Sequence, residues 1–185
     1  SILILSTLLE SMDYKVHRSQ TVVDHQLLMI NDLDIAQAYV KEHLPVTDLT
    51  WNYRYYNIFA VTSPSPTFFN LFKEVCSIIR EHVGDDRPLW MQSWLNRHLH
   101  NEVLDWHGHD YPWHGYVCID PKDSTTLFEG YDINNEVGNI YIGPGHRRHK
   151  VESLSAFEGH RLTLGFDVHD ETGTPYDQFG MVPVL

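Results

Sequence analysis

The chain has 185 residues, a length that suits one domain with one well-buried core. Hydrophobic residues make up 42% and charged residues 21%, as in ordinary globular proteins, and 25 acidic residues against 13 basic ones give a formal net charge of −12. This charge argues against a broad phosphate-binding surface, and so against duplex nucleic acid as a partner, although one or two arginines can still bind a small anion.

The N-terminal residues 1–5 are apolar, but they lack the basic flank and the length of a signal peptide or a membrane span. The two cysteines, Cys76 and Cys118, form no CxxC pair, which excludes a zinc ribbon or a thioredoxin-like site. Two free thiols suit a reducing compartment. We therefore expect a cytoplasmic protein that does not associate with membranes. No feature of the sequence indicates an oligomeric state.

Residues 1–88 are predicted to hold short strands and two helices. Three runs have the β-branched, aromatic or apolar composition of strands: Thr21–Val23, Leu27–Ile30 and Tyr53–Val61. The stretch before residue 31 also fits a helix. A first helix is expected from a cap at Asp32 or Asp34 to about His43, where apolar residues follow the helical period. A second helix, Phe68–Val83, has one apolar stripe and ends at Gly84.

From residue 89 onward, short strand-like runs alternate with turns. Seven strands are predicted: Trp90–Leu99, Val103–His109, Gly115–Ile119, Thr125–Glu129, Gly138–Ile142, His149–Leu154 and Arg161–Val168. Seven strands at this spacing predict a sandwich or a barrel, and the preceding helices are expected to brace one sheet from outside. Without a convincing linker, we expect a single α+β, mainly β domain over residues 1–185. Its core is residues 89–170, and residues 171–185 form a C-terminal tail.

Thirteen histidines are the unusual feature of the composition. His107 and His109 stand two positions apart on a predicted strand, so both side chains are expected on the same face. Two imidazoles on one face can bind a single divalent metal ion, since histidine is the commonest side-chain metal ligand. The alternative is a pair of half-exposed polar residues at a strand end. The neighbouring His114 and His146 are expected to lie behind the ligands or on the surface.

A third histidine follows a strand and a turn. Residues 138–149 consist of an apolar strand, a Pro144–Gly145 turn and then His149, which the turn delivers to the start of the next strand. A ligand from a remote strand completes a facial set of three, with positions left open for a substrate or oxygen. The sequence therefore predicts that His107, His109 and His149 bind one metal ion, with iron(II) favoured.

Arg161 begins the strand that follows. It shares a face with Thr163 and Gly165, opposite Leu162 and Leu164. An arginine beside a metal site can bind a carboxylate through two parallel hydrogen bonds. The alternative is a surface ion pair, for which this acidic chain offers many partners.

These residues carry a family resemblance over roughly Trp90–Val168. The order of a His-x-acid position, a histidine preceded by proline, and an arginine about a dozen residues on resembles the 2-oxoglutarate/Fe(II)-dependent oxygenases. The resemblance implies a double-stranded β-helix (jelly-roll, cupin-like) fold, Fe(II) as cofactor and 2-oxoglutarate as cosubstrate. His107 and His149 match two iron ligands of the family. Arg161 matches the arginine that binds the far carboxylate of 2-oxoglutarate.

Two further residues match the dealkylating branch of that family. There an Asn-Arg-Tyr sequence stands the same distance before the first ligand, and its asparagine and tyrosine hydrogen-bond the cosubstrate. Asn96 and His98 occupy those positions here, with histidine where tyrosine is usual. The resemblance therefore implies that Asn96 and His98 help to bind 2-oxoglutarate.

The sequence departs from the family at His109, where an aspartate or glutamate is normal. A histidine ligand there makes a three-histidine site with a more positive metal. Two alternatives remain. A β-bulge could turn the adjacent Asp110 inward instead, or His109 could be no ligand at all, as in halogenating members, although those have a small residue at this position.

Three-histidine sites are typical of cupins, which share the jelly-roll geometry. Pro144 to His149 fits the second cupin motif, with His146 where glycine is expected, but the glutamate expected after the His-x-His is absent. The sequence thus predicts a non-haem iron(II), 2-oxoglutarate-dependent dioxygenase that hydroxylates a small molecule or a protein side chain. The alternatives are a cupin-like three-histidine dioxygenase or isomerase that does not use 2-oxoglutarate, and a non-enzymatic jelly-roll binding module.

Overall fold

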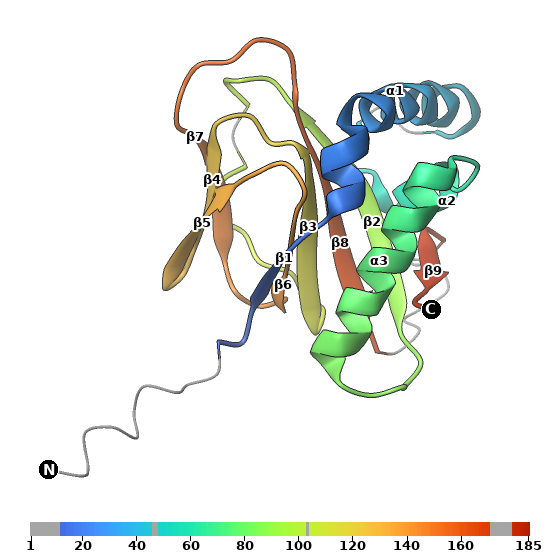
Figure 1. Ribbon diagram of the computed structural model, residues 1–185, viewed down its shortest axis with the longest axis vertical. Helices are drawn as coiled ribbons and strands as arrows, with labels where there is room; N and C mark the ends of the chain where they lie inside the picture. Colours follow the sequence, from blue (N-terminus) through green and yellow to red (C-terminus); the bar gives the residue numbers. More distant parts are fainter. Residues whose placement is uncertain (1–11, 46–47, 103, 171–178) are drawn as a thin grey trace, which may run out of the picture.

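The computed structural model describes residues 12–45, 48–102, 104–170 and 179–185, and within them two antiparallel sheets are covered on one side by helices (Figure 1). The strands are β1 (Lys15–Arg18), β2 (Trp90–His98), β3 (Trp113–Asp120), β4 (Ser124–Phe128), β5 (Tyr131–Asn135), β6 (Asn139–Pro144), β7 (His149–Ser153), β8 (Arg161–His169) and β9 (Met181–Pro183). The helices are α1 (Gln20–His43), a 3₁₀ turn (Tyr53–Tyr55), α2 (Ile58–Val61) and α3 (Pro66–Val83).

The strand order identifies the fold as a jelly roll. The larger sheet has the order β1-β6-β3-β8-β2-β9, and the smaller one has the order β5-β4-β7. The chain therefore crosses between sheets after β3, returns with β6, crosses again to β7 and returns with β8 between β3 and β2. This pattern confirms the predicted α+β, mainly β class with a double-stranded β-helix core.

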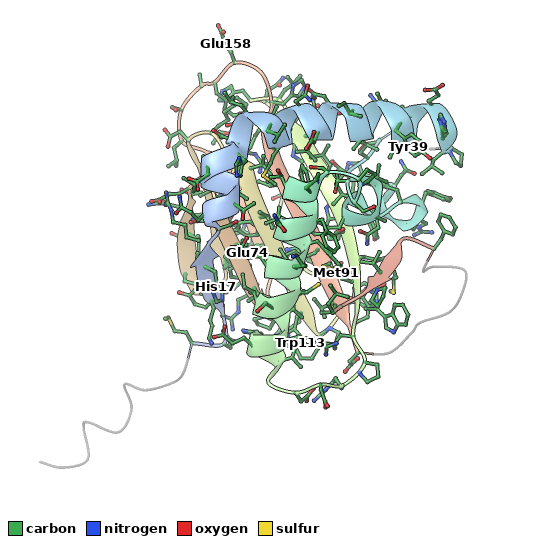
Figure 2. The ribbon with its side chains drawn as sticks, turned by 45° about the vertical axis from the view of Figure 1, so that its right-hand side comes forward. His17, Tyr39, Glu74, Met91, Trp113 and Glu158 are labelled. Atoms are coloured by element: carbon green, nitrogen blue, oxygen red, sulfur yellow. The ribbon has the colours of Figure 1, made fainter. Side chains whose placement is uncertain are left out.

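Along the strands of the larger sheet, successive side chains point to opposite faces and so enter two different interiors. On β3, Val117 and Ile119 pack into the main core against the helices, whereas Tyr116 and Cys118 face the smaller sheet. Figure 2 shows α1 and α3 lying over the same face of the larger sheet. The helices therefore brace this sheet from outside, as the sequence predicts, and the space between the two sheets is free for an aromatic cluster and a cavity.

The predicted strands Thr21–Val23 and Leu27–Ile30 are wrong, because both runs lie inside α1. The helix begins before them, where the Ser19 hydroxyl accepts a hydrogen bond from the Val22 backbone N–H at 3.3 Å. The buried side chains of α1 recur at helical spacing: Val22, Met29, Leu33, Ala36 and Val40. This continuous buried face outweighs the strand propensity of two short runs.

The predicted strand Tyr53–Val61 is also wrong, since this segment forms the 3₁₀ turn and α2. Asn57 interrupts it, because its side-chain oxygen accepts hydrogen bonds from the backbone N–H groups of Phe59 and Ala60 at 3.0 and 3.3 Å. This cap starts a helical turn in a run whose aromatic composition favours a strand. The second predicted helix is confirmed as α3, which begins two residues earlier, at Pro66.

Six of the seven predicted core strands are present as β2, β3, β4, β6, β7 and β8. The seventh, Val103–His109, is wrong as a strand: Val103 lies outside the described residues, and the rest forms one isolated bridge, between His107 and His149. Sequence reasoning missed β1, β5 and β9. The last of these lies within the predicted tail and pairs with β2.

The apolar residues 1–5 lie outside the described residues. Among the residues that the structure describes, no helix combines the length and the apolar character needed to cross a membrane.

Candidate functional site

Two backbone contacts fix the loop that carries the first two histidines. The backbone N–H of His107 donates to the His149 carbonyl at 3.0 Å, and the reverse bond is 2.8 Å long. The N–H of His109 donates to the Gly145 carbonyl at 2.9 Å. A Cβ at Gly145 would collide with the Tyr111 carbonyl oxygen, so only glycine lets the turn before β7 pack this closely on the loop. The loop is therefore held at two points, by β7 and by the turn before it.

Gly145→Ala is expected to lower the free energy of unfolding by about 1–3 kcal/mol, the usual cost of an extra carbon in a packed site. It should also weaken metal binding, because the His109 backbone loses its anchor. Urea denaturation and metal titration measure the two effects. Gly159→Ala is the comparison, since a Cβ there has no atom within 4 Å. Its only cost is the strain of a side chain in the left-handed backbone region. Gly159→Ala should keep its metal affinity, so equal losses of metal affinity in the two variants would refute the packing argument.

The loop and β7 bring three imidazoles together. One ring nitrogen from each of His107, His109 and His149 lies within 4.8 Å of the other two. Each Nδ1 faces an oxygen: that of His107 lies 2.7 Å from the Asp105 carbonyl, that of His149 lies 3.4 Å from the Arg147 carbonyl, and that of His109 lies 3.0 Å from the Asp167 carboxylate. Because these oxygens only accept, each Nδ1 carries the proton and each Nε2 keeps its lone pair.

These nitrogens fit a metal ion. The His109 Nε2 atom is buried and has no hydrogen-bond partner, which is costly unless another group binds it. The ring centroids are 5.4 Å apart for His107 and His109, 4.3 Å for His107 and His149, and 5.5 Å for His109 and His149. Rings that bind one ion through bonds of about 2.1 Å, at right or tetrahedral angles, have centroids roughly 4.5–5.3 Å apart, and each of the three separations lies within about 0.2 Å of that range.

His107 and His149 are neutral at physiological pH, which is the form that binds a metal. Burial, together with the neighbouring imidazoles of His114 and His107, lowers the pKa of His149 to about 2. Burial likewise lowers the pKa of His107 from its ordinary value. A divalent cation therefore meets no competing protons on the His107 and His149 rings near pH 7.

The structure decides between the alternatives that the sequence left open for the residues around the trio. Asp110 is exposed and belongs to neither cluster of candidate ligands, so no bulge turns it inward. His146 is exposed, which agrees with the expectation that it lies on the surface. His114 is buried, and its Nδ1 lies 2.9 Å from the Asp167 carboxylate. Burial alone would raise the pKa of Asp167, but hydrogen bonds from His109 and His114 hold it well below its usual range, so Asp167 is a carboxylate at neutral pH.

A cavity of about 240 Å³ opens beside the three histidines. On β8, alternate residues face it: Arg161, Thr163, Gly165 and Asp167. The facing strand β2 contributes Trp94 and Asn96, and the segment before α2 contributes Thr50, Trp51 and Tyr53. A Cβ at Gly165 would lie 2.5 Å from the Trp94 indole, so glycine leaves room for that ring on the cavity floor.

Arg161 lies on the cavity wall with its charge unpaired. Its residue is 4% exposed, and its Nη2 donates to the His98 Nδ1 at 3.0 Å. Among the described residues, no acid forms an ion pair with Arg161, and burial lowers its pKa from the ordinary value. Thus the alternative of a surface ion pair is wrong. A buried guanidinium without an anion is costly, so its environment suits an anionic ligand.

Asn96 and His98 take different positions. Asn96 lines the cavity, donates to the Thr163 hydroxyl at 3.2 Å and accepts from the Trp94 indole N–H at 3.2 Å. His98 does not line the cavity; it lies opposite Arg161 in the register of β2 and β8 and accepts that residue's hydrogen bond. His98 thus positions the guanidinium, in place of the direct cosubstrate contact that the resemblance implies.

The ligand-free protein is expected to lose stability as the pH falls from about 6.5 to 4. Burial lowers the pKa of His98 and of His169 to about 4, so between these values the unfolded chain binds more protons than the folded one. Each histidine then costs about 1–2 kcal/mol at pH 5 relative to pH 7. Urea denaturation at both pH values measures the loss, and His98→Asn should reduce it. A pH-independent midpoint would contradict these environments.

Comparison with known proteins locates the fold. No protein-family model matches the chain, and no curated protein matches it in sequence. The apo crystal structure of HygX from Streptomyces hygroscopicus matches at a TM-score of 0.59 and 14% identity, over 85% of this chain and 82% of that one. SnoK, a non-heme alpha ketoglutarate dependent carbocyclase from nogalamycin biosynthesis, matches at 0.58 and 11%, over 91% and 83%. The chain shares the fold of these proteins.

A 2OG-Fe(II) oxygenase family oxidoreductase from Burkholderia pseudomallei also matches, at 13% identity and a TM-score of 0.48. That match covers 60% of this chain and 60% of the other. All of these identities are low, so the comparison establishes the double-stranded β-helix architecture, whereas the chemistry has to be argued from the residues of this chain.

Sequence reasoning missed one residue of the site, Asp167, and left two positions open for His114, which lies behind the ligands and not on the surface. The signal for Asp167 was present: alternation along β8 places Arg161, Thr163 and Gly165 on one face, and two further positions reach Asp167. His114 carried no such signal, because its contact with Asp167 depends on β3 and β8 being neighbours in the sheet.

Proposed function

We propose that this protein is a non-haem iron(II)- and 2-oxoglutarate-dependent oxygenase that hydroxylates a small molecule or a protein side chain. One observation carries the proposal: a single cavity has three convergent histidines at one end and a buried, unpaired arginine on its wall. A cosubstrate with a metal-chelating end and a distal carboxylate matches both features.

In this proposal, His107, His109 and His149 hold Fe(II), and Arg161 binds the distal carboxylate of 2-oxoglutarate. When bound, the iron and its cosubstrate supply the activation of dioxygen: one oxygen atom goes to a C–H bond of the substrate and the other to succinate, which forms with loss of carbon dioxide from 2-oxoglutarate. Three protein ligands leave the remaining coordination positions open for this chemistry.

The residues of the chain orient and shield the reactants. Asn96 and Thr163 lie between the two ends of the cavity on adjacent strands and offer amide and hydroxyl groups to the cosubstrate. His98, whose pKa burial and the Arg161 charge lower to about 4, stays neutral and accepts a guanidinium hydrogen bond without competing for the anion. Trp51, which is 64% exposed at the cavity, offers a ring to the substrate.

The structural neighbours support the proposal without deciding it. HygX has also been crystallised with nickel and 2-oxoglutarate bound, and that structure matches this chain at a TM-score of 0.53 and 14% identity. The same fold thus accommodates a metal and this cosubstrate in another protein.

A second candidate function is a cupin-like three-histidine metalloenzyme that does not use 2-oxoglutarate. His109, in the place of a carboxylate ligand, favours it. The buried Arg161 counts against it, since such an enzyme needs no carboxylate-binding arginine in the cavity.

Anaerobic addition of Fe(II) and 2-oxoglutarate tests the proposal. Chelation of the cosubstrate should produce a weak visible charge-transfer band, and succinate in its place should produce none. Exposure to air without substrate should then release carbon dioxide slowly. Bound iron without the band would exclude the 2-oxoglutarate mechanism and favour the cupin-like alternative. Failure to bind any divalent metal would leave the non-enzymatic binding module.

A further inference from the structure

Asp167 is the only acid among the described residues that line the cavity. It stands near the end of β8, is 3% exposed and contacts two histidines. Its Oδ1 lies 3.0 Å from the His109 Nδ1 and 2.9 Å from the His114 Nδ1, and its Oδ2 lies 3.1 Å from the His109 Nδ1. A buried carboxylate with both oxygens directed at imidazoles is a built arrangement, and the proposed reaction does not use it directly.

These three residues could be mistaken for a second metal site, since one atom from each of His109, His114 and Asp167 lies within 4.8 Å of the others. The ring geometry argues otherwise. The His109 and His114 rings are stacked, with centroids 3.7 Å apart and planes inclined by 11°. With centroids only 3.7 Å apart the two rings lie face to face, so their in-plane lone pairs run side by side and cannot converge on one ion. Two parallel N–H groups can, however, donate to one carboxylate, which is the arrangement present.

The contact determines what His109 can do. With its Nδ1–H donated to Asp167, the imidazole keeps its lone pair on Nε2, a buried atom without a partner. The ring itself lies beside those of His107 and His149. His109 also stands where the related oxygenases have an acidic ligand. The site therefore still contains a carboxylate, that of Asp167, but the His109 ring stands between it and the other two histidines. Carboxylates behind metal-bound histidines fix the ring and make it a stronger donor.

We propose that Asp167 is a positioning residue that acts through His109: it fixes the tautomer and orientation of the ring and supplies, behind the ligand, the negative charge that an acidic ligand would supply directly. His114 is the second donor that holds this carboxylate in place. The inference rests on the proposed metal site.

The test is a pair of substitutions compared in two backgrounds, with anaerobic Co(II) titration as the readout. In the wild-type background, Asp167→Asn should weaken Co(II) binding about 10–100-fold and shift the visible Co(II) bands. In the His109→Asp background, the carboxylate at position 109 faces Asp167 directly, so Asp167→Asn should leave Co(II) binding unchanged or strengthen it. Asp120→Asn, which removes a charge that pairs with Lys122 at the far end of β3, should leave affinity unchanged in both backgrounds.

Equal losses in the two backgrounds would overturn the inference, because Asp167 would then act independently of His109. No loss in the wild-type background would overturn it as well. A measurement on the unsubstituted chain avoids dependence on the folding of the variants. Nitrogen-15 NMR of the metal-free protein should find His109 protonated on Nδ1, with its signals identified by their loss in His109→Asp. Protonation on Nε2 would refute the assigned role.

The failures of the two proposals differ. If the wild type binds Co(II) and Fe(II) but shows no 2-oxoglutarate band, the oxygenase function fails while the role of Asp167 is still decided by the two backgrounds. If the band appears and the two backgrounds respond alike, only the role of Asp167 fails. If the wild type binds no metal, both are overturned.

Discussion

His149→Ala is expected to abolish iron binding and the decarboxylation of 2-oxoglutarate. The loss of metal affinity should be roughly 100-fold or more, since even residues behind a ligand typically contribute 10–100-fold. Burial and the neighbouring imidazoles lower the pKa of His149 to about 2, so its ring is an unprotonated donor near neutral pH. Anaerobic titration with Fe(II) and the release of carbon dioxide measure the two losses.

His146→Ala is the matched control for this variant, because the same residue type is removed three positions away, from an exposed site in the turn before β7. It should bind iron as the wild type does. Thermal unfolding of the metal-free proteins checks that His149→Ala still folds. An iron affinity that survives His149→Ala would remove β7 from the metal site, and with it the convergence on which the proposed function depends.

The sequence predicts that the three histidines converge, but it places His107 and His109 on a strand, which is wrong. Alternation on a strand places His107 and His109 on one face, yet the structure has no strand there. Instead, the backbone of His107 pairs with His149, and that of His109 bonds to Gly145. These contacts join residues about 40 positions apart in the sequence. Local pattern cannot reveal them, although the similarity to a family motif can.

The contrast between local pattern and contacts distant in the sequence also explains where the predicted elements and the structure differ. Strands of the core were predictable because their alternation follows from having a helix-covered face and a cavity face. Short runs such as Thr21–Val23 were not, because a capped helix with a buried face decides their structure. The support of Arg161 by His98 depends on β8 lying beside β2, which is a property of the sheet order and not of either strand.

Arg161→Met is expected to weaken 2-oxoglutarate binding about 100-fold, because two charge-assisted hydrogen bonds contribute about 3 kcal/mol. The affinity for iron should not change, since Arg161 is not among the residues whose nitrogens converge. Arg97→Met is the matched control: Arg97 is the residue before His98 on β2, and its guanidinium forms an ion pair with Asp34 on α1 instead of facing the cavity. It should bind 2-oxoglutarate normally. The anaerobic charge-transfer band, titrated with 2-oxoglutarate, measures both.

The unfolding temperature distinguishes an arginine that binds a ligand from one that stabilises the fold. A structural arginine is paired, and its removal destabilises the protein; Arg161 is buried without an acid among the described residues, so its removal relieves an uncompensated charge. Metal-free Arg161→Met should therefore unfold at the same temperature as the wild type or above it, while losing its cosubstrate. A variant that unfolds early and still binds 2-oxoglutarate would make Arg161 a structural residue. The opposite pattern would make its unpaired charge a cost to the fold that only an anionic ligand offsets.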